Sequence, residues 1–167
     1  FICSFFVADA KHITGGEMIY DYIVPGTSPN SKTYRITLRL FRDDNCFDCA
    51  PMPVSVSVGI YDNNNNQLLG TYRNIPLSSS EQLPLNPLPP CITNPPTLVY
   101  TVGYYSYTTE LPDNTNGYTA AYQTCCRIVG IRNVPNCVGF VFITQIPGTN
   151  ILGLNGTDNS PRFSQGI

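Results

Sequence analysis

Charge is scarce in this chain of 167 residues, in which only 12% of the side chains are Asp, Glu, Lys or Arg. That is about half the share found in an ordinary globular protein, and the sequence contains no basic run or stripe. Without such a stripe, a nucleic acid or an anionic membrane surface has no electrostatic footprint on this chain. Asn, Ser, Thr, Tyr, Gly and Pro must instead cover the surface, and this composition is typical of extracellular β-proteins.

Long apolar runs are missing as well. No segment approaches the ~20 apolar residues that a membrane-spanning helix needs, so direct membrane insertion is not expected. The apolar run 1–7 is followed by Ala8-Asp9-Ala10, which has the small-x-small pattern of a signal-peptide cleavage site. We therefore expect 1–10 to be the tail of a signal peptide and the mature protein to be secreted or displayed at the cell surface. The alternative is that this run is the first strand of the domain.

Histidine occurs once, at His12, beside the expected mature N-terminus. Catalysis by Ser-His-Asp or Cys-His groups needs an imidazole that the fold holds in place, whereas chain ends fray. Gly-rich phosphate loops, nucleophile elbows and metalloprotease helix motifs are absent too. The sequence therefore predicts no enzyme, no catalytic residue and no cofactor.

Strict alternation of apolar and polar residues is the main structural signal that is present. It is clearest in 34–40 and 54–60, and 98–104 continues in the same style. A period of two indicates strands with one buried and one solvated face. Less regular β-rich runs occupy 18–24, 68–72, 118–125 and 139–146. About seven short strands predict an all-β fold, namely an antiparallel, immunoglobulin-like β-sandwich stapled by disulfides.

Turn residues separate these runs. The segments 62–66 and 113–117 predict hairpin turns, because Asn, Asp and Gly tolerate left-handed backbone angles. Seven prolines in 76–96 exclude a central strand there and predict an extended crossover between the two sheets. We expect the β-sandwich domain to span 11–148 and 149–167 to be a linker into a following β-domain, because Gly and Asn become frequent after Pro147.

Seven cysteines are present, of which Cys3 lies in the expected signal peptide. The other six are Cys46, Cys49, Cys91, Cys125, Cys126 and Cys137. In a secreted chain an even number predicts disulfides, whose pairing the sequence leaves open. A bridge from Cys91 to Cys125 or Cys126 would tie the crossover to a core strand and stabilise the fold by about 3–4 kcal/mol. The alternatives are a zinc site of four thiolates and a redox motif at Cys46-Phe47-Asp48-Cys49.

Acidic side chains form weak candidates for a calcium site. Asp43, Asp44, Asp48 and Asp62 offer the hard oxygen ligands that calcium prefers, although no complete calcium-loop spacing occurs. The alternative is that these residues are solvated turn residues. No metal is therefore assigned to the chain.

Tyrosine is frequent, and Tyr104, Tyr105 and Tyr107 cluster in one β-rich run. Successive residues of a strand point to opposite faces, so some of these rings are expected to face outward as ligand contacts. The alternative is that they stabilise the sheet through cross-strand pairs.

Seven short strings occur in a fixed order along the chain. They are 12–20 (HITGGEMIY), 34–38 (YRITL), 41–43 (FRD), 59–64 (GIYDNN), 91–96 (CITNPP), 122–127 (YQTCCR) and 159–163 (NSPRF). In this order they resemble the N-terminal region of large Bacteroidetes surface proteins of the gliding-motility-associated kind, which carry PKD-like repeats. Cys46, Cys49 and Cys137 have no place in that pattern.

The resemblance implies export by type IX secretion and further β-domains downstream, and it supplies no catalytic residues. We expect a non-catalytic structural or binding module of a secreted cell-surface protein, acting in adhesion or surface-matrix contact. Its partners would be downstream domains of the same chain and surface glycans or matrix proteins. The alternative is a carbohydrate-binding accessory domain of a secreted hydrolase.

Overall fold

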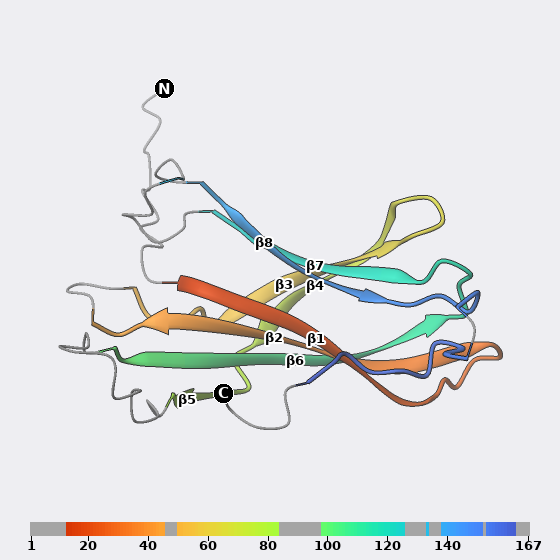
Figure 1. The fold of residues 1–167 in the computed structure, drawn as a ribbon, viewed down its shortest axis with the longest axis horizontal. Helices are drawn as coiled ribbons and strands as arrows, with labels where there is room; N and C mark the ends of the chain where they lie inside the picture. The colour runs from red at the N-terminus through yellow and green to blue at the C-terminus, as the bar shows by residue number, and fades with distance from the viewer. Residues whose placement is uncertain are drawn as a thin grey trace, which may run out of the picture.

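The computed structural model describes residues 13–45, 50–83, 98–125, 133, 138–151 and 153–162, without the side chains of 71–73. Eight strands follow one another along this part of the chain (Figure 1). They are β1 (Ile13–Pro25), β2 (Ser31–Asp43), β3 (Ser55–Asp62), β4 (Gln67–Pro76), β5 (Ser79–Gln82), β6 (Tyr100–Pro112), β7 (Tyr118–Thr124) and β8 (Phe140–Ile146). The prediction of an all-β chain is confirmed, and β5 is the strand that the sequence did not reveal.

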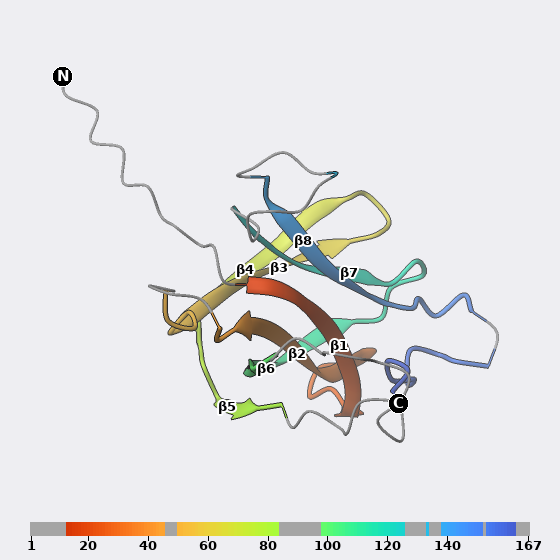
Figure 2. The same ribbon diagram turned by 60° about the vertical axis from the view of Figure 1, so that its left-hand side comes forward.

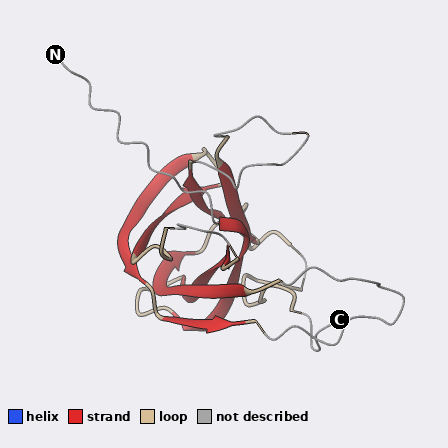
Figure 3. Cartoon of the chain, turned by 90° about the vertical axis from the view of Figure 1, so that its left-hand side faces the viewer, coloured by secondary structure: helices blue, strands red, loops and turns tan. Residues whose placement is uncertain are grey.

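The strands form two antiparallel sheets that pack as a sandwich, which confirms the predicted two-sheet architecture. Sheet A has the strand order β1-β2-β6-β5, and sheet B has the order β4-β3-β7-β8. Figure 3 shows the strands surrounding a common interior. No helix in the described residues is long and apolar enough to cross a bilayer.

Alternation in β2 fixes which face of sheet A is buried. Ile36, Leu38 and Leu40 are 0%, 1% and 0% exposed, whereas Arg35 and Arg39 point to the opposite face. Burying each of these aliphatic side chains stabilises the fold by roughly 1.5–3 kcal/mol. β2 therefore anchors the core, with β1 and β6 paired on its two sides.

β3 supplies the matching inward row from sheet B. Val56, Val58 and Ile60 are buried, as the alternation predicted. Val54 was expected on the same buried face but is 82% exposed. It precedes the strand, and its carbonyl accepts a hydrogen bond from the Leu77 amide at 3.0 Å.

The two predicted hairpin turns differ in outcome. The segment 62–66 does join the paired strands β3 and β4, and Asn66 has a left-handed φ of 58°. The prediction for 113–117 was wrong, because this segment carries the chain from β6 in sheet A to β7 in sheet B. Gly117 is required there: its φ is 73°, and a Cβ atom would lie 2.0 Å from the Ile146 carbonyl oxygen.

The described part of the proline-rich segment crosses between the sheets as predicted. The chain leaves β4 in sheet B and enters sheet A as β5, which pairs with β6 from Ser79↔Tyr104 to Gln82↔Thr101. β5 is an edge strand of four exposed residues, so it agrees with the exclusion of a central strand. The rest of this segment, 84–97, lies outside the described residues.

Residues 156–162, which we call the C-terminal strap, lie along the free edge of β1. The Ser160 amide donates to the Tyr20 carbonyl at 2.9 Å, and the Tyr20 amide donates to the Ser160 hydroxyl at 2.9 Å. The Tyr22 amide donates to the Asn159 side chain at 2.8 Å. This part of the expected linker therefore packs onto the sandwich and covers one of its edges.

Sheet B opens between its two central strands. The ladder of β3 with β7 runs from Asp62↔Tyr118 to Gly59↔Ala121, whereas β7 and β8 stay paired as far as Thr124↔Phe140. Figures 1 and 2 both show the β7–β8 pair turning away from the β3–β4 pair beyond this point.

Candidate functional site

The three predicted contact tyrosines occupy different environments. Tyr105 is 1% exposed, and its hydroxyl donates to the Pro53 carbonyl at 2.5 Å. Tyr107 packs against the core. Tyr104 lies on the outer face of sheet A, where its hydroxyl donates to Glu81. Its ring therefore contacts the neighbouring strands of its own sheet.

Tyr104 keeps its proton at neutral pH. Burial raises the pKa of its hydroxyl, and the hydrogen bond to Glu81 and the charge of that carboxylate raise the pKa further. The Arg39 guanidinium lies 5.4 Å from the centre of the same ring, a cation–π contact. These contacts are the cross-strand interactions that the sequence offered as the alternative to ligand binding.

Most of the predicted cysteines lie outside the described residues. Cys46, Cys49, Cys91, Cys126 and Cys137 belong to that group, as does Asp48. Cys125 is described at the end of β7, where it is exposed and makes no disulfide with another described residue. The predicted disulfides therefore stay predictions.

The described acidic candidates are engaged in loop contacts. The Asp44 carboxylate accepts from the Arg42 side chain at 2.7 Å and from the Thr101 hydroxyl at 2.5 Å. Burial raises the pKa of Asp44, but these hydrogen bonds outweigh burial and hold the pKa below its usual value. Asp43 accepts the Asn45 amide at 2.9 Å. Among the described residues no group of three or more His, Cys, Asp or Glu side chains is placed to hold a metal ion.

A network of asparagines ties the loops together at one end of the sandwich. The Asn114 side-chain oxygen accepts from the Asn64 amide group at 2.8 Å and from the Gly117 backbone at 2.9 Å. Its nitrogen donates to Asp62 at 2.7 Å. Asn116 donates to the Asn64 oxygen at 2.8 Å. Asn114 is 7% exposed, so it lies at the buried centre of this network. The polar loops are therefore ordered by hydrogen bonds to one another.

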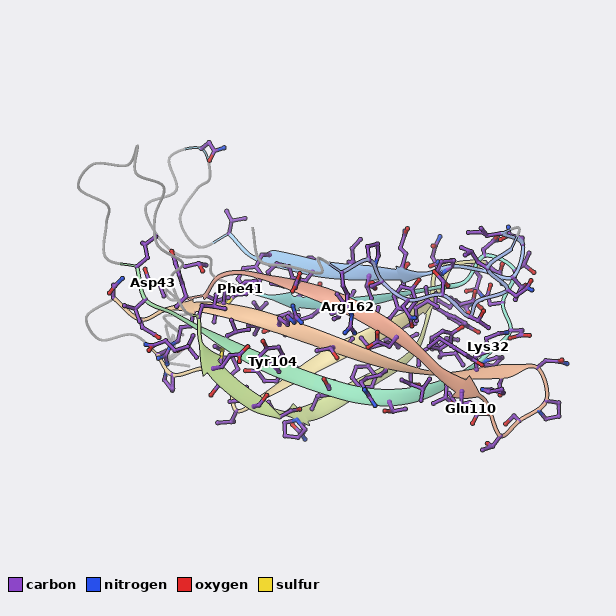
Figure 4. All side chains as sticks on the ribbon, turned by 60° about the horizontal axis from the view of Figure 1, so that its bottom comes forward. Lys32, Phe41, Asp43, Tyr104, Glu110 and Arg162 are labelled. Atoms are coloured by element: carbon purple, nitrogen blue, oxygen red, sulfur yellow. The ribbon has the colours of Figure 1, made fainter. Side chains whose placement is uncertain are left out.

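Sheet A carries charge on its outer side. Arg39 and Glu17 form an ion pair at 2.5 Å, and Arg162 of the C-terminal strap pairs with Asp21 of β1 at 2.6 Å. Figure 4 views this side, with Tyr104 on the sheet, Lys32 and Glu110 toward one end and Asp43 toward the other. The charged side chains are thus distributed along the length of sheet A.

Sheet B carries an uncharged outer face on β3, β7 and β8, which we call the neutral face. Its members are Ser57, Gly59, Tyr61, Thr119, Ala121, Gln123, Val141, Ile143 and Gln145. β7 and β8 contain no charged residue, and β3 contains only Asp62 at its end. Val141 and Ile143 are 57% and 56% exposed, and Leu68 of β4 is 50% exposed at the margin.

A hollow lies in the neutral face where β3 separates from β7. Its volume is about 230 Å³, and it is lined by Ser57, Gly59, Tyr61, Ala121 and Gln123. Gly59 and Ala121 form the last pair of the ladder, and the space stays open because Gly59 has no side chain and Ala121 has only a methyl group. The Tyr61 ring borders Gly59, because a Cβ atom there would lie 3.2 Å from the ring carbon Cε2.

A second hollow continues toward the β7–β8 loop. Its volume is about 450 Å³, and its lining residues are Gln123, Thr124, Cys125, Gly139, Phe140 and Val141. Gln123 lines both hollows. The two together extend the concave part of the neutral face along β7.

The groups around the first hollow suit binding and not acid–base chemistry. Ser57 and Tyr61 offer hydroxyl groups, and the Gln123 amide can both donate and accept hydrogen bonds. None of the residues lining this hollow is a carboxylate or an imidazole. The neutral face can therefore hold an uncharged partner by hydrogen bonds and apolar contact.

Comparison with known proteins gives no match to a family model, to a curated protein or to a solved structure. The neutral face was also not among the residues that the sequence pointed to. A signal for it does exist: Phe140, Val141, Phe142 and Ile143 are apolar on both faces of one strand. Such a strand is usually covered on both sides, and in the part of the chain that the structure describes Val141 and Ile143 remain exposed on one side of β8.

Proposed function

We propose that this chain is a non-catalytic structural and binding module of a secreted cell-surface protein, acting in adhesion or surface-matrix contact. The neutral face carries this proposal. Exposed Val141 and Ile143 stand beside a hollow with hydroxyl and amide groups, on a face without charge. Apolar surface next to a few polar groups, with charge kept away, is the usual composition at the centre of a protein contact surface.

The proposal includes an immunoglobulin-like identity for the sandwich. If the strands are named in chain order with β4 as an added strand C′, sheet A has the order A-B-E-D and sheet B the order C′-C-F-G. Constant-type immunoglobulin sheets have the orders ABED and CFG. The strand order therefore supports this identity, and the neutral face corresponds to the outer face of the C-F-G strands.

Export and disulfides belong to the same proposal. The three connections β2–β3, β5–β6 and β7–β8 contain all six cysteines beyond the expected signal peptide. These connections start and finish at one end of the sandwich, where the Asp44 amide donates to the Val99 carbonyl at 2.8 Å. The common location supports disulfides between the connections. The low charge and the resemblance to Bacteroidetes surface proteins support export through type IX secretion.

A bead-retention assay tests the contact surface. Beads coated with the chain are applied to surface matrix from the cells that produce the protein, and retained beads are counted. Ala121→Glu places a charge in the hollow and is expected to lower retention by about tenfold, because an unpaired charge must be desolvated on contact. Thr108→Glu is the matched control, because Thr108 lies outside the neutral face as an exposed residue of β6, opposite Arg35.

Both variants should keep the unfolding midpoint of the native chain, because neither replaces a core residue. Equal retention of the two variants would remove the neutral face from the proposal. Loss of retention by Thr108→Glu alone would assign contact to sheet A instead.

Carbohydrate binding is the second candidate function, and the first hollow is the observation that favours it. A neutral sugar presents hydroxyl groups and apolar ring faces, which fit the Gln123 amide, the Ser57 hydroxyl and the Tyr61 ring. Affinity electrophoresis in gels that contain a neutral or a uronic-acid polysaccharide tests it. Carbohydrate binding is supported if the neutral polysaccharide retards the native chain and Gln123→Glu abolishes this retardation. It is contradicted if the native chain migrates equally in the neutral and the uronic-acid gel.

A further inference from the structure

Gly59 stands in the middle of β3, where a glycine weakens the strand because it has no side chain that packs. Glycine inside a strand usually marks a bulge, the close approach of another backbone, or a place where a ligand comes near. β3 has register shifts against β4 on either side of this position, but Gly59 itself pairs regularly with Thr71 of β4 and Ala121 of β7. A bulge is therefore not the reason for this glycine.

The neighbours of Gly59 do not require a glycine either. Its φ is not positive, and a Cβ atom there would meet Leu68 Cδ1 and Tyr61 Cε2 of two side chains, each at 3.2 Å. Gly16 of β1 shows the contrast, because a Cβ atom at that position would lie 2.5 Å from the Arg39 carbonyl oxygen. Space for a ligand above the strand is the explanation that remains for Gly59.

Main-chain groups stand open in the first hollow, beyond the last pair of the β3–β7 ladder. The Asn63 amide donates to the Gly117 carbonyl at 3.1 Å, so every second residue of β3 from Asn63 turns its main-chain groups toward β7. Ser57 belongs to this set, and a longer ladder would place it opposite Gln123. The ladder ends before this pair, although both residues line the hollow. Their N–H and C=O groups therefore face the hollow without a partner in the opposite strand.

We infer that the first hollow binds one neutral sugar ring of a surface glycan. The inference rests on the proposed function, because it names the partner of the neutral face. The hollow of about 230 Å³ is smaller than the roughly 300–1,000 Å³ of sites for drug-sized ligands, so it suits a single ring. The apolar face of the ring lies against Gly59, Ala121 and the Tyr61 ring. Its hydroxyl groups reach the side-chain and main-chain groups of Ser57 and Gln123.

The open main-chain groups favour a sugar over an apolar side chain of a protein partner. An apolar side chain would bury the N–H and C=O groups of Ser57 and Gln123 without hydrogen bonds, which is unfavourable. Sugar hydroxyl groups both donate and accept, so they satisfy both kinds of group. An acidic sugar is disfavoured, because the residues that line the hollow offer no positive charge to its carboxylate.

NMR titration of the ¹⁵N-labelled chain tests the sugar site. The probes are glucose, galactose, mannose, xylose and N-acetylglucosamine, with glucuronic acid and N-acetyl-leucine amide for comparison. At least one neutral sugar should shift the amide signals of Gly59, Ala121 and Gln123, whereas the two comparison probes should not. Absence of these shifts with all five neutral sugars would overturn the inference, and so would shifts from N-acetyl-leucine amide alone.

Gly59→Ala tests whether this glycine keeps the hollow open. The added methyl group occupies the space for the ring, so it should raise the dissociation constant of the neutral sugar by about tenfold. The unfolding midpoint should not fall, because the methyl group meets only flexible side chains. Gly70→Ala of β4 is the matched control, since a Cβ atom there meets nothing within 4 Å. Native affinity in Gly59→Ala would contradict the role of Gly59.

Gln123→Ala tests the hydrogen bonds to the ring. It should raise the dissociation constant by about tenfold, because it removes an amide group that both donates and accepts. Gln145→Ala is the matched control, since Gln145 is exposed on β8 and does not line the hollow. Equal weakening by both variants would overturn the assignment of the sugar to this hollow.

The bead-retention assay with Ala121→Glu separates this inference from the proposed function. Loss of retention in Ala121→Glu without any sugar-induced shift would keep the neutral face as a contact surface and overturn the sugar site. Sugar-induced shifts in the native chain, together with full retention of Ala121→Glu, would support the sugar site and contradict the proposed function.

Discussion

At the scale of single residues, hydrogen bonds of buried asparagine side chains hold the polar loops of this protein in place. Asn114 is 7% exposed, and its side chain makes hydrogen bonds to four residues, namely Asp62, Asn64, Asn116 and Gly117. Asn can serve such a position because its amide group both accepts and donates. A composition rich in Asn therefore need not mean mobile loops, since the chain uses these side chains in place of charged ones.

Asn114→Ala should lower the free energy of unfolding by about 2–3 kcal/mol, because it leaves several buried donors and acceptors without partners. Asn65→Ala is the control, since Asn65 is exposed and only accepts the Gln67 amide at 2.9 Å. Urea unfolding of both variants measures the difference. Equal stabilities would show that the network does not hold the loops.

Glu110 should make the stability of the β1–β2 loop depend on pH. Its carboxylate accepts from the Ser31 hydroxyl at 2.6 Å, from the Ser28 amide at 2.8 Å and from the Thr27 hydroxyl at 2.8 Å. These hydrogen bonds, with that from Ser31 the largest cause, hold the pKa of Glu110 far below its ordinary value of 4.5. The stability that the Glu110 carboxylate contributes is therefore fully present above pH 4.5. It is lost as the pH falls toward the lower pKa of the folded state.

Glu110→Gln should lower the urea midpoint at neutral pH and should reduce the further loss of stability at about pH 3. Glu81→Gln removes a carboxylate from the β5 edge and serves as the control. If the urea midpoint of Glu110→Gln fell as much between neutral pH and about pH 3 as that of the native chain, this role of the carboxylate would be contradicted.

At the scale of elements, the C-terminal strap acts as a substitute for a paired strand. It satisfies the backbone groups of Tyr20, and the Tyr34 hydroxyl donates to its Gly156 carbonyl at 2.7 Å. Burial raises the pKa of Tyr34, and the nearby carboxylates of Asp113 and Asp158 add to this shift. The hydroxyl therefore stays protonated and continues to donate at neutral pH.

Ser160→Ala should cost about 1–3 kcal/mol, because the Tyr20 amide loses its acceptor in a buried position. Amide hydrogen exchange at Tyr20 should become faster in this variant. Thr157→Ala is the control in the same segment, since the exposed Thr157 hydroxyl donates to the Leu154 carbonyl, which lies just before the strap, and not to β1. Unchanged exchange at Tyr20 in Ser160→Ala would mean that the strap does not protect β1.

Seven of the eight strands could be predicted from the sequence, and the reason lies in local pattern. The apolar residues of β2 and β3 alternate strictly, so their buried apolar residues were predictable, whereas Thr37 is buried on the face expected to be solvated and Val54, just before β3, is exposed. Polar, four-residue β5 exists only because β6 offers it an edge, which no local pattern encodes. The segment 113–117 has the same residues as a hairpin turn, and only the packing of the sheets makes it a crossover.

The candidate site could not be predicted, because it depends on a distance between strands. In the sequence, Ser57 and Gln123 look like ordinary outward-facing strand residues. They line a hollow only because β3 and β7 are not paired at these two positions. The tyrosine cluster gave a misleading signal, because Tyr105 fills the core.

At the scale of the whole molecule, the described ion pairs and the neutral face lie on different sheets, and the charged residues of sheet B are Asp62 at the end of β3 and Arg73 in β4. The described ion pairs lie on sheet A and its loops, and the neutral face occupies sheet B. Charge keeps a protein soluble and apart from its neighbours. The division therefore leaves the neutral face as the side that can make close contact.

Site-specific photocrosslinking on the assembled cell surface tests this central claim most directly. A photoreactive amino acid is placed at Ala121 in the neutral face or at Thr108 on sheet A, and crosslinked products are identified by mass spectrometry. We predict a crosslinked partner, whether protein or glycan, from position 121 and none from position 108. Crosslinks from position 108 with none from position 121 would contradict the assignment of the neutral face as the contact surface.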